Sequence, residues 1–118
     1  MSKVLENSIL FASMIFLVGC AGAKQTYKIT DVTKESTIIL RNNGSQQNVS
    51  YILISGEGNI DGEAEISLIL DDKPYKTERI SGNAKFSWNG DWYSEDAKIE
   101  YKPSSVKGGD LNLEYQFK

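Results

Sequence analysis

Apolar and polar residues alternate with a period of two through much of the second half of the chain. In residues 63–70 the apolar side is formed by Ala64, Ile66, Leu68 and Leu70. The same alternation recurs in residues 84–88, 97–101 and 111–117. This period is typical of β-strands that bury one face, so the pattern predicts at least four half-buried strands.

Other segments complete a β-rich pattern. Residues 26–30 and 37–41 are rich in β-branched and aromatic side chains, and residues 49–55 are apolar on both sides of a strand. Gly56–Gly62 predicts a loop, and the glycines of Ser81-Gly82-Asn83 and Asn89-Gly90 predict hairpin turns. We therefore expect an all-β fold, a small antiparallel β-sandwich or barrel of about eight short strands.

The inward side of each strand predicts the core. The large side chains on these sides are Tyr51, Leu53, Ile66, Leu68, Phe86, Trp88, Ile99, Tyr101, Leu113 and Tyr115. Since the chain has one cysteine, it cannot form an internal disulfide, and this core must stabilise the domain without one.

The N-terminus has a different character. Polar residues are followed by an uncharged apolar run from Ile9 to Val18, which has the length of a secretory signal and is too short to span a bilayer. The run ends in Leu17-Val18-Gly19-Cys20, which resembles the lipobox of bacterial lipoproteins. The expected organisation is a signal peptide at 1–19, a short tether at 20–25 and a single β-domain at 26–118.

The lipobox resemblance implies that the signal is cleaved before Cys20 and that Cys20 carries lipid. Two or more acyl chains anchor a protein stably, because each buried CH2 contributes about 0.8 kcal/mol. In Gram-negative members of the family, an aspartate after the cysteine favours retention in the inner membrane. This chain has Ala21 there, so the resemblance implies the outer membrane, facing the periplasm, if the organism has one.

Composition excludes several functions. The net charge is −3 and the sequence has no cluster of basic residues, which argues against a nucleic-acid partner. The chain has no histidine, so Ser-His and Cys-His couples are absent and zinc lacks its usual ligands. A hydrolase using two carboxylates remains the third alternative, but Asp71-Asp72 lie in a predicted turn and Glu63 and Glu65 on a solvent face. We therefore expect no enzymatic activity, no cofactor and no metal. Glu57–Gly62 resembles the start of a calcium loop but has Leu68 at position twelve, so a glycine-rich turn is the better interpretation, with a weak calcium site of other geometry left open.

The densest group of candidate binding residues lies between Trp88 and Asp96. If Asn89-Gly90 is a two-residue turn, Phe86 faces Tyr93, and Trp92 points outward beside acids. An exposed tryptophan there can stack on a sugar or anchor a protein partner, whereas the alternative is that it covers the open end of the barrel. The candidate partner-binding residues are Asn89, Asp91, Trp92, Tyr93, Glu95 and Asp96.

These patterns together predict a lipid-anchored protein of the bacterial cell envelope. Its β-domain is expected to be a binding module for another envelope macromolecule, a protein or a glycan. The alternative is a module that binds a carbohydrate or small ligand through the Trp88–Asp96 hairpin.

Overall fold

A computed structural model describes residues 23–43 and 48–118. These residues form an antiparallel all-β fold, as predicted. Within the two ranges there is no helix of a length and hydropathy suited to crossing a membrane. The expected signal peptide, the lipobox and Cys20 lie outside the described residues.

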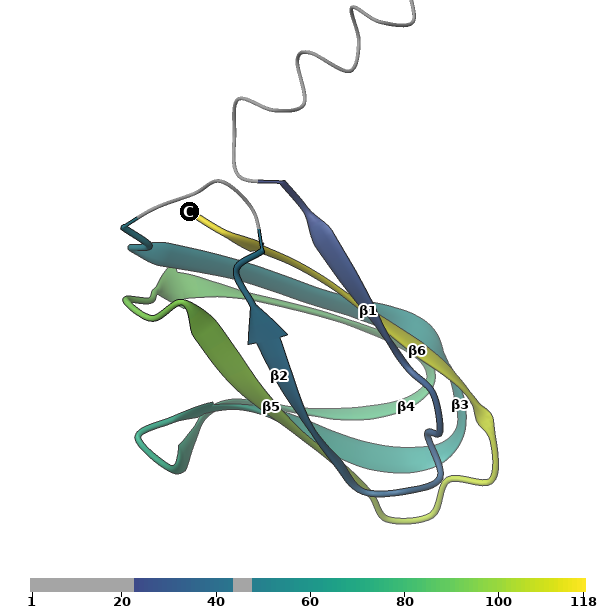
Figure 1. The fold of residues 1–118 in the computed structure, drawn as a ribbon. Helices are drawn as coiled ribbons and strands as arrows, with labels where there is room; N and C mark the ends of the chain where they lie inside the picture. Colours follow the sequence, from purple (N-terminus) through teal and green to yellow (C-terminus); the bar gives the residue numbers. More distant parts are fainter. Residues whose placement is uncertain (1–22, 44–47) are drawn as a thin grey trace, which may run out of the picture.

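The described residues form six strands (Figure 1). They are paired in the order β1-β6-β3-β5-β2, and β4 pairs with β3. Their bounds are β1 Gln25–Ile29, β2 Ser36–Arg41, β3 Tyr51–Leu70, β4 Lys73–Asp91, β5 Asp96–Pro103 and β6 Gly109–Phe117.

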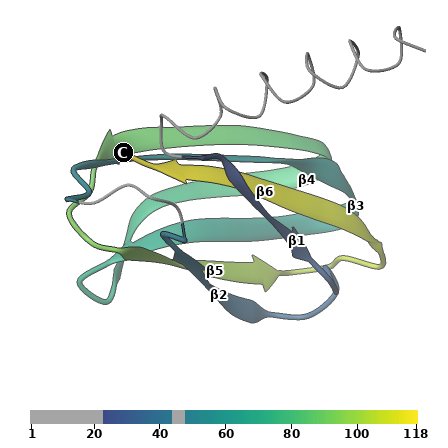
Figure 2. The ribbon, with the colours of Figure 1, turned by 45° about the horizontal axis from the view of Figure 1, so that its top comes forward.

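The sheet folds over into two layers, because the long β3–β4 hairpin bends in its middle (Figure 2). The first half of β3 pairs with β6 and the second half with β5. We call β1, β6, residues 51–60 of β3 and residues 82–91 of β4 the β6 layer. The β5 layer consists of β2, β5 and the remaining halves of β3 and β4.

The bend lies where β3 has two more residues than β4. Ile60 pairs with Gly82 and Glu63 with Ser81, which leaves Asp61 and Gly62 without partners in the ladder. Gly62 has a φ of 137°, and a Cβ at this position would lie 1.7 Å from the Ser105 carbonyl oxygen. Only glycine fits both this backbone conformation and this close approach.

The predicted strand count was too high, because two predicted turn regions lie inside strands. Gly56–Gly62 belongs to β3, and Ser81-Gly82-Asn83 belongs to β4. Glycine at position 56 has a packing reason, since a Cβ there would lie 2.2 Å from a ring carbon of Phe86. The missing side chain makes room in the core for this ring, which packs on Trp88 with ring centroids 4.8 Å apart.

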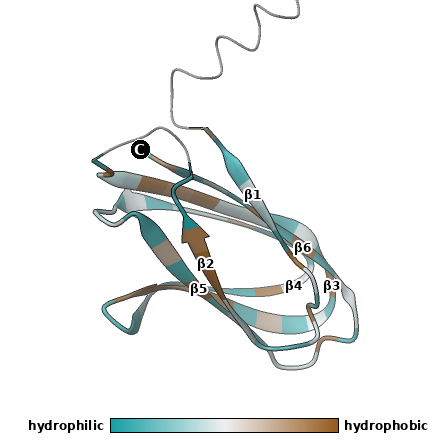
Figure 3. Ribbon diagram, in the orientation of Figure 1, coloured by the Kyte–Doolittle hydropathy of each residue, from teal (hydrophilic) through white to brown (hydrophobic). Residues whose placement is uncertain are grey.

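The core lies between the layers and contains the predicted residues except Tyr51 and Leu53. These two are half-buried, and the inward positions are occupied by Ile52 and Ile54, which are 2% and 1% exposed. The residues on both sides of the strand are apolar in this segment, which is brown in Figure 3. The local sequence pattern could therefore not show which side is buried. Pairing decides it, since Ile52 lies opposite Phe117 and Ile54 opposite Tyr115.

Leu70, which was also predicted to face inward, is 42% exposed because it lies at the tip of the β3–β4 hairpin.

Candidate functional site

The predicted hairpin at Asn89-Gly90 does not form. Both residues lie within β4, where they pair with Leu53 and Ile52. The expected contact of Phe86 with Tyr93 was therefore wrong, because Phe86 pairs with Gly56 in β3. An Asn-Gly pair permits a turn, but β4 has the longer ladder with β3 available and continues to Asp91.

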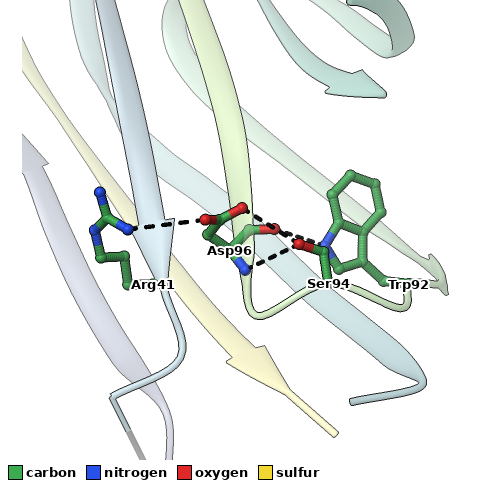
Figure 4. A network of polar contacts seen from close by, with 4 residues as sticks. All are labelled: Arg41, Trp92, Ser94 and Asp96. Atoms are coloured by element: carbon green, nitrogen blue, oxygen red, sulfur yellow. Dashed lines mark hydrogen bonds and ion pairs between the residues drawn. The ribbon is translucent and has the colours of Figure 1, made fainter. Parts of the chain in front are cut away.

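Trp92 points into the core rather than outward. It is 5% exposed, and its indole Nε1 donates a hydrogen bond to the Asp96 carbonyl oxygen at 2.9 Å (Figure 4). A buried tryptophan with a satisfied N–H is a structural element that covers one end of the domain. Its burial leaves no indole face for a sugar or a protein to contact.

The nearby acids hold the link between β4 and β5 against β2. Asp96 accepts a hydrogen bond from the Ser94 hydroxyl at 3.3 Å and lies 3.8 Å from the Arg41 guanidinium (Figure 4). The Glu95 carboxylate accepts a hydrogen bond from the Asn42 side chain at 3.2 Å. These groups are exposed, so each contact contributes about 1 kcal/mol or less.

The remaining predicted binding residues, Tyr93, Asn89 and Asp91, do not lie together. Tyr93 is 77% exposed on the β4–β5 link. Asn89 and Asp91 lie on the outer face of the β6 layer, where Asn89 accepts a hydrogen bond from the Tyr51 hydroxyl at 3.0 Å. The six predicted residues therefore do not form a single pocket.

A different surface is hollowed, on the outer face of the β6 layer. A depression of about 490 Å³ crosses its strands, with a second depression on either side. We call the central depression the trough. It is lined by Thr26, Ser55, Gly56, Glu57, Lys85, Phe86, Ser87, Asn112, Leu113 and Glu114.

Strand register creates the trough. Thr26 pairs with Glu114, Glu114 with Ser55, and Ser55 with Ser87, so one transverse row of mostly small side chains crosses all four strands. Longer side chains flank this row. The row on one side contains Lys28, Asn112, Glu57 and Lys85, and the row on the other contains Gln116, Leu53 and Asn89.

The trough presents hydroxyl, amide and carboxylate groups together with ammonium groups. Hydroxyls both donate and accept hydrogen bonds, and carboxylates accept only. Glu114 lies 3.6 Å from the Lys24 ammonium, and Glu57 pairs across the strands with Lys85. Because both signs of charge are present, the trough suits a ligand with many neutral polar groups better than one of strong single charge.

The two-residue alternation of residues 84–88 and 111–117 puts Ser87, Asn112 and Glu114 on the polar, outward side of their strands, but it did not show that these three residues lie together. β1, β3, β4 and β6 contribute to one row, and their register depends on contacts between distant parts of the sequence. Small polar side chains on the outer side of a strand are also found on ordinary solvent-exposed strands. The only sequence signal for the trough was therefore the alternation of small polar residues in three strands.

The calcium-like segment is part of the sheet. Glu57 to Ile60 pair with β4 on one side and with β6 on the other, so these residues form no ion-binding loop. In the part of the chain that the structure describes, no three histidine, cysteine, aspartate or glutamate side chains are grouped to hold a metal ion.

No family model and no curated protein matches the chain. A solved structure described as a novel family of disulfide-linked pili, the Bacillus endospore appendages, is similar at 12% identity and a TM-score of 0.49, covering 80% of this chain and 84% of that one. The Tobacco streak virus coat protein is similar at 11% identity and a TM-score of 0.43, covering 82% and 87%. The carbohydrate-binding module CBM36, in complex with calcium and xylotriose, is similar at 13% identity and a TM-score of 0.37, covering 83% and 92%. Similarities of this size carry no argument about function.

Proposed function

We propose that this protein is a lipoprotein of the bacterial cell envelope that binds a glycan chain in the trough, without enzymatic activity. The observation that carries the binding role is the transverse row of polar, mostly small side chains formed by Thr26, Glu114, Ser55 and Ser87. Neighbouring strands lie about 4.8 Å apart, so four strands give a trough about 14 Å long.

The chemistry of the trough favours a glycan over a protein. Protein interfaces concentrate their binding energy on aromatic and arginine side chains in desolvated pockets. Here both tryptophans are 5% exposed, Phe86 and Leu113 in the floor of the trough are buried, and Leu53 in the flanking row is half-buried. Sugar hydroxyls both donate and accept hydrogen bonds, which matches the serine, asparagine and glutamate side chains of the trough.

The proposed anchor determines where the ligand is found. Five residues, from Cys20 to Lys24, separate the proposed lipid from the start of β1. A chain of five residues spans at most about 18 Å. The β6 layer, which begins with β1, is therefore held close to the membrane surface, and a glycan of the envelope is within reach.

The test is to fill the trough. The lipidated protein, extracted in detergent, is mixed with peptidoglycan fragments and with envelope polysaccharide, and the bound fraction is measured. Ser55→Tyr places a large side chain in the middle of the row and is expected to reduce binding at least tenfold. Thr37→Tyr is the control, because Thr37 is exposed on β2 in the other layer.

Three outcomes contradict the proposal. Equal glycan binding by Ser55→Tyr and wild type excludes the trough as the site. Equal loss in both variants indicates general damage and removes the case for the trough. If wild type binds no glycan and a photo-cross-linker at position 55 captures one envelope protein that a cross-linker at 37 does not, a protein partner replaces the glycan.

A further inference from the structure

The long outer edge of β4 is open. Among the described residues β4 pairs with β3 alone, so its other edge is free along Lys73–Asp91, a strand of 19 residues. Strands are commonly three to ten residues long. A free edge can pair with another chain, and proteins usually protect such edges with charges, proline or bulges.

The two halves of this edge differ in protection. The half in the β5 layer carries Lys73, Pro74, Lys76 and Arg79, together with a register shift between Leu68 and Ile69 of β3. Proline cannot donate to a ladder, and the cations repel an approaching strand of like charge. The half in the β6 layer, residues 82–91, contains Lys85 as its one cation. This half is the part of the edge that can accept another strand.

The hydrogen-bond pattern identifies the free backbone groups. Tyr51 and Lys118 exchange hydrogen bonds of 3.0 and 2.9 Å, so the N–H and C=O of Tyr51 point toward β6. Alternate residues of β3 therefore point toward β4, in agreement with the bond from the Trp92 N–H to the Ser50 carbonyl at 3.1 Å. In β4 the backbone N–H and C=O groups of Gly90 and Trp88 then face β3. The backbone groups that point toward the free edge belong to Asn83, Lys85, Ser87, Asn89 and Asp91.

We propose that a second copy of this chain pairs with this edge, antiparallel and about a two-fold axis at Ser87. Self-pairing of identical strands must be symmetric, and a register centred on Ser87 joins two outward-facing residues. The two β6 layers then form one continuous eight-stranded sheet. This pairing does not depend on the identity of the trough's ligand.

Side chains support this register. On the outer face Lys85 lies opposite Asn89 of the second copy, and Asn83 lies opposite Asp91. Lys85 is then the diagonal neighbour of the second copy's Asp91, at about 7–8 Å between Cα atoms, which is within reach of a lysine. No two like charges lie directly opposite each other.

On the inner face the same register places Phe86 opposite Trp88 of the second copy. Aromatic pairs that lie opposite each other on neighbouring strands stabilise a sheet.

The register also joins the two troughs end to end. Ser87 closes the transverse row of each copy at β4, so the two rows meet at the axis. The combined trough crosses eight strands and is about 34 Å long, against about 14 Å in one copy. A long polymer can then contact both copies at once.

Charge confines the pairing to the β6 layer. Self-pairing of the other half of β4 would instead bring Lys73, Lys76 and Arg79 of two copies together, with Glu78 as the one acid on this half.

The test uses cysteine cross-linking in the lipidated, full-length protein. In a hydrogen-bonded antiparallel pair the Cα atoms are about 5.5 Å apart, within the range of a disulfide. Ser87→Cys is expected to give a covalent dimer on mild oxidation. Wild type is the first control, since Cys20 is its one cysteine. Ser81→Cys is the second, because Ser81 is exposed on the same strand but lies in the other layer.

Neighbouring positions test the register. Lys85→Cys and Asn89→Cys lie two residues from the axis. Each new cysteine is therefore about 14 Å from the same cysteine of the second copy, and neither variant alone is expected to give a covalent dimer. A mixture of these two variants is expected to cross-link, since residue 85 lies opposite residue 89. A Ser87→Cys variant that stays monomeric, or cross-linking equal to that of Ser81→Cys, overturns the proposal.

Ser87→Pro provides the second measurement. The Ser87 N–H faces the free edge, so proline there removes no bond to β3. The variant is expected to retain the circular dichroism spectrum of wild type and to lose the dimer in sedimentation. A variant that stays folded and dimeric overturns the pairing, and one that unfolds overturns the assignment of this N–H to the free edge. If the wild-type protein binds glycan but is monomeric, the pairing is wrong while the proposed glycan binding stands. The two proposals can be separated because Ser55→Tyr tests the trough by itself.

Discussion

Trp92 offers a direct test of how the end of the domain is built. It is 5% exposed, and its indole N–H donates to the Asp96 carbonyl at 2.9 Å. Trp92→Ala removes nearly all of this packing and is expected to destabilise the domain by about 3–5 kcal/mol. Because small domains have about 5–15 kcal/mol of stability in total, this is a large fraction. Trp92→Phe keeps a ring but removes the donor, at about 1–3 kcal/mol.

Urea unfolding of residues 23–118, followed by circular dichroism, measures both variants. Tyr93→Ala is the matched control, because this neighbouring aromatic is 77% exposed and its loss is expected to change stability by about 0.5 kcal/mol or less. A folded Trp92→Ala protein within about 1 kcal/mol of wild type contradicts the assignment of Trp92 to the core.

Two further predictions concern the anchor and the acid limit of stability. Cys20→Ser is expected to release the protein from membranes or leave it uncleaved, with its β-type circular dichroism intact; mass spectrometry that finds unmodified Cys20 in membrane-extracted protein contradicts lipidation. The hydroxyl and the backbone N–H of Thr33 donate to the Asp31 carboxylate at 2.6 and 3.0 Å and hold the pKa of Asp31 below its usual value. A lowered pKa contributes stability above the unfolded pKa that is lost as pH falls through the folded value. Thr33→Val is therefore expected to lose less stability than wild type as pH falls below the ordinary aspartate pKa of about 3.9, and urea midpoints that fall in parallel in the two proteins contradict this.

Two-residue alternation was sufficient to predict the fold class and most of the core. It correctly identified the inward residues of β5 and β6, where one face is apolar and the other polar. It failed where both faces are apolar, as at Ile52 and Ile54, because only pairing with β6 selects the buried side.

The turn-forming residues gave wrong predictions at the glycines of β3 and β4 and at Asn89, which lie within strands. Glycine in β3 makes room for Phe86 and for the bend, and these reasons are found in the folded state alone. The trough was missed for a related reason, since its residues come from four strands whose register no local pattern encodes. Trp92 was placed outward because its position was derived from a turn that does not form.

The pairing of β1 with β6 has a consequence for the order of folding. β1 is the first strand of the described residues, and its Gln25 pairs with Tyr115 of β6, the last of them. If the chain is exported with its N-terminus leading, as proposed, β1 reaches the far side of the membrane first but finds its partner last. The β3–β4 hairpin, whose strands are joined by a two-residue tip, can form meanwhile. The strand nearest the proposed lipid would therefore stay unpaired, and accessible to proteases and chaperones, until β6 has followed it across the membrane.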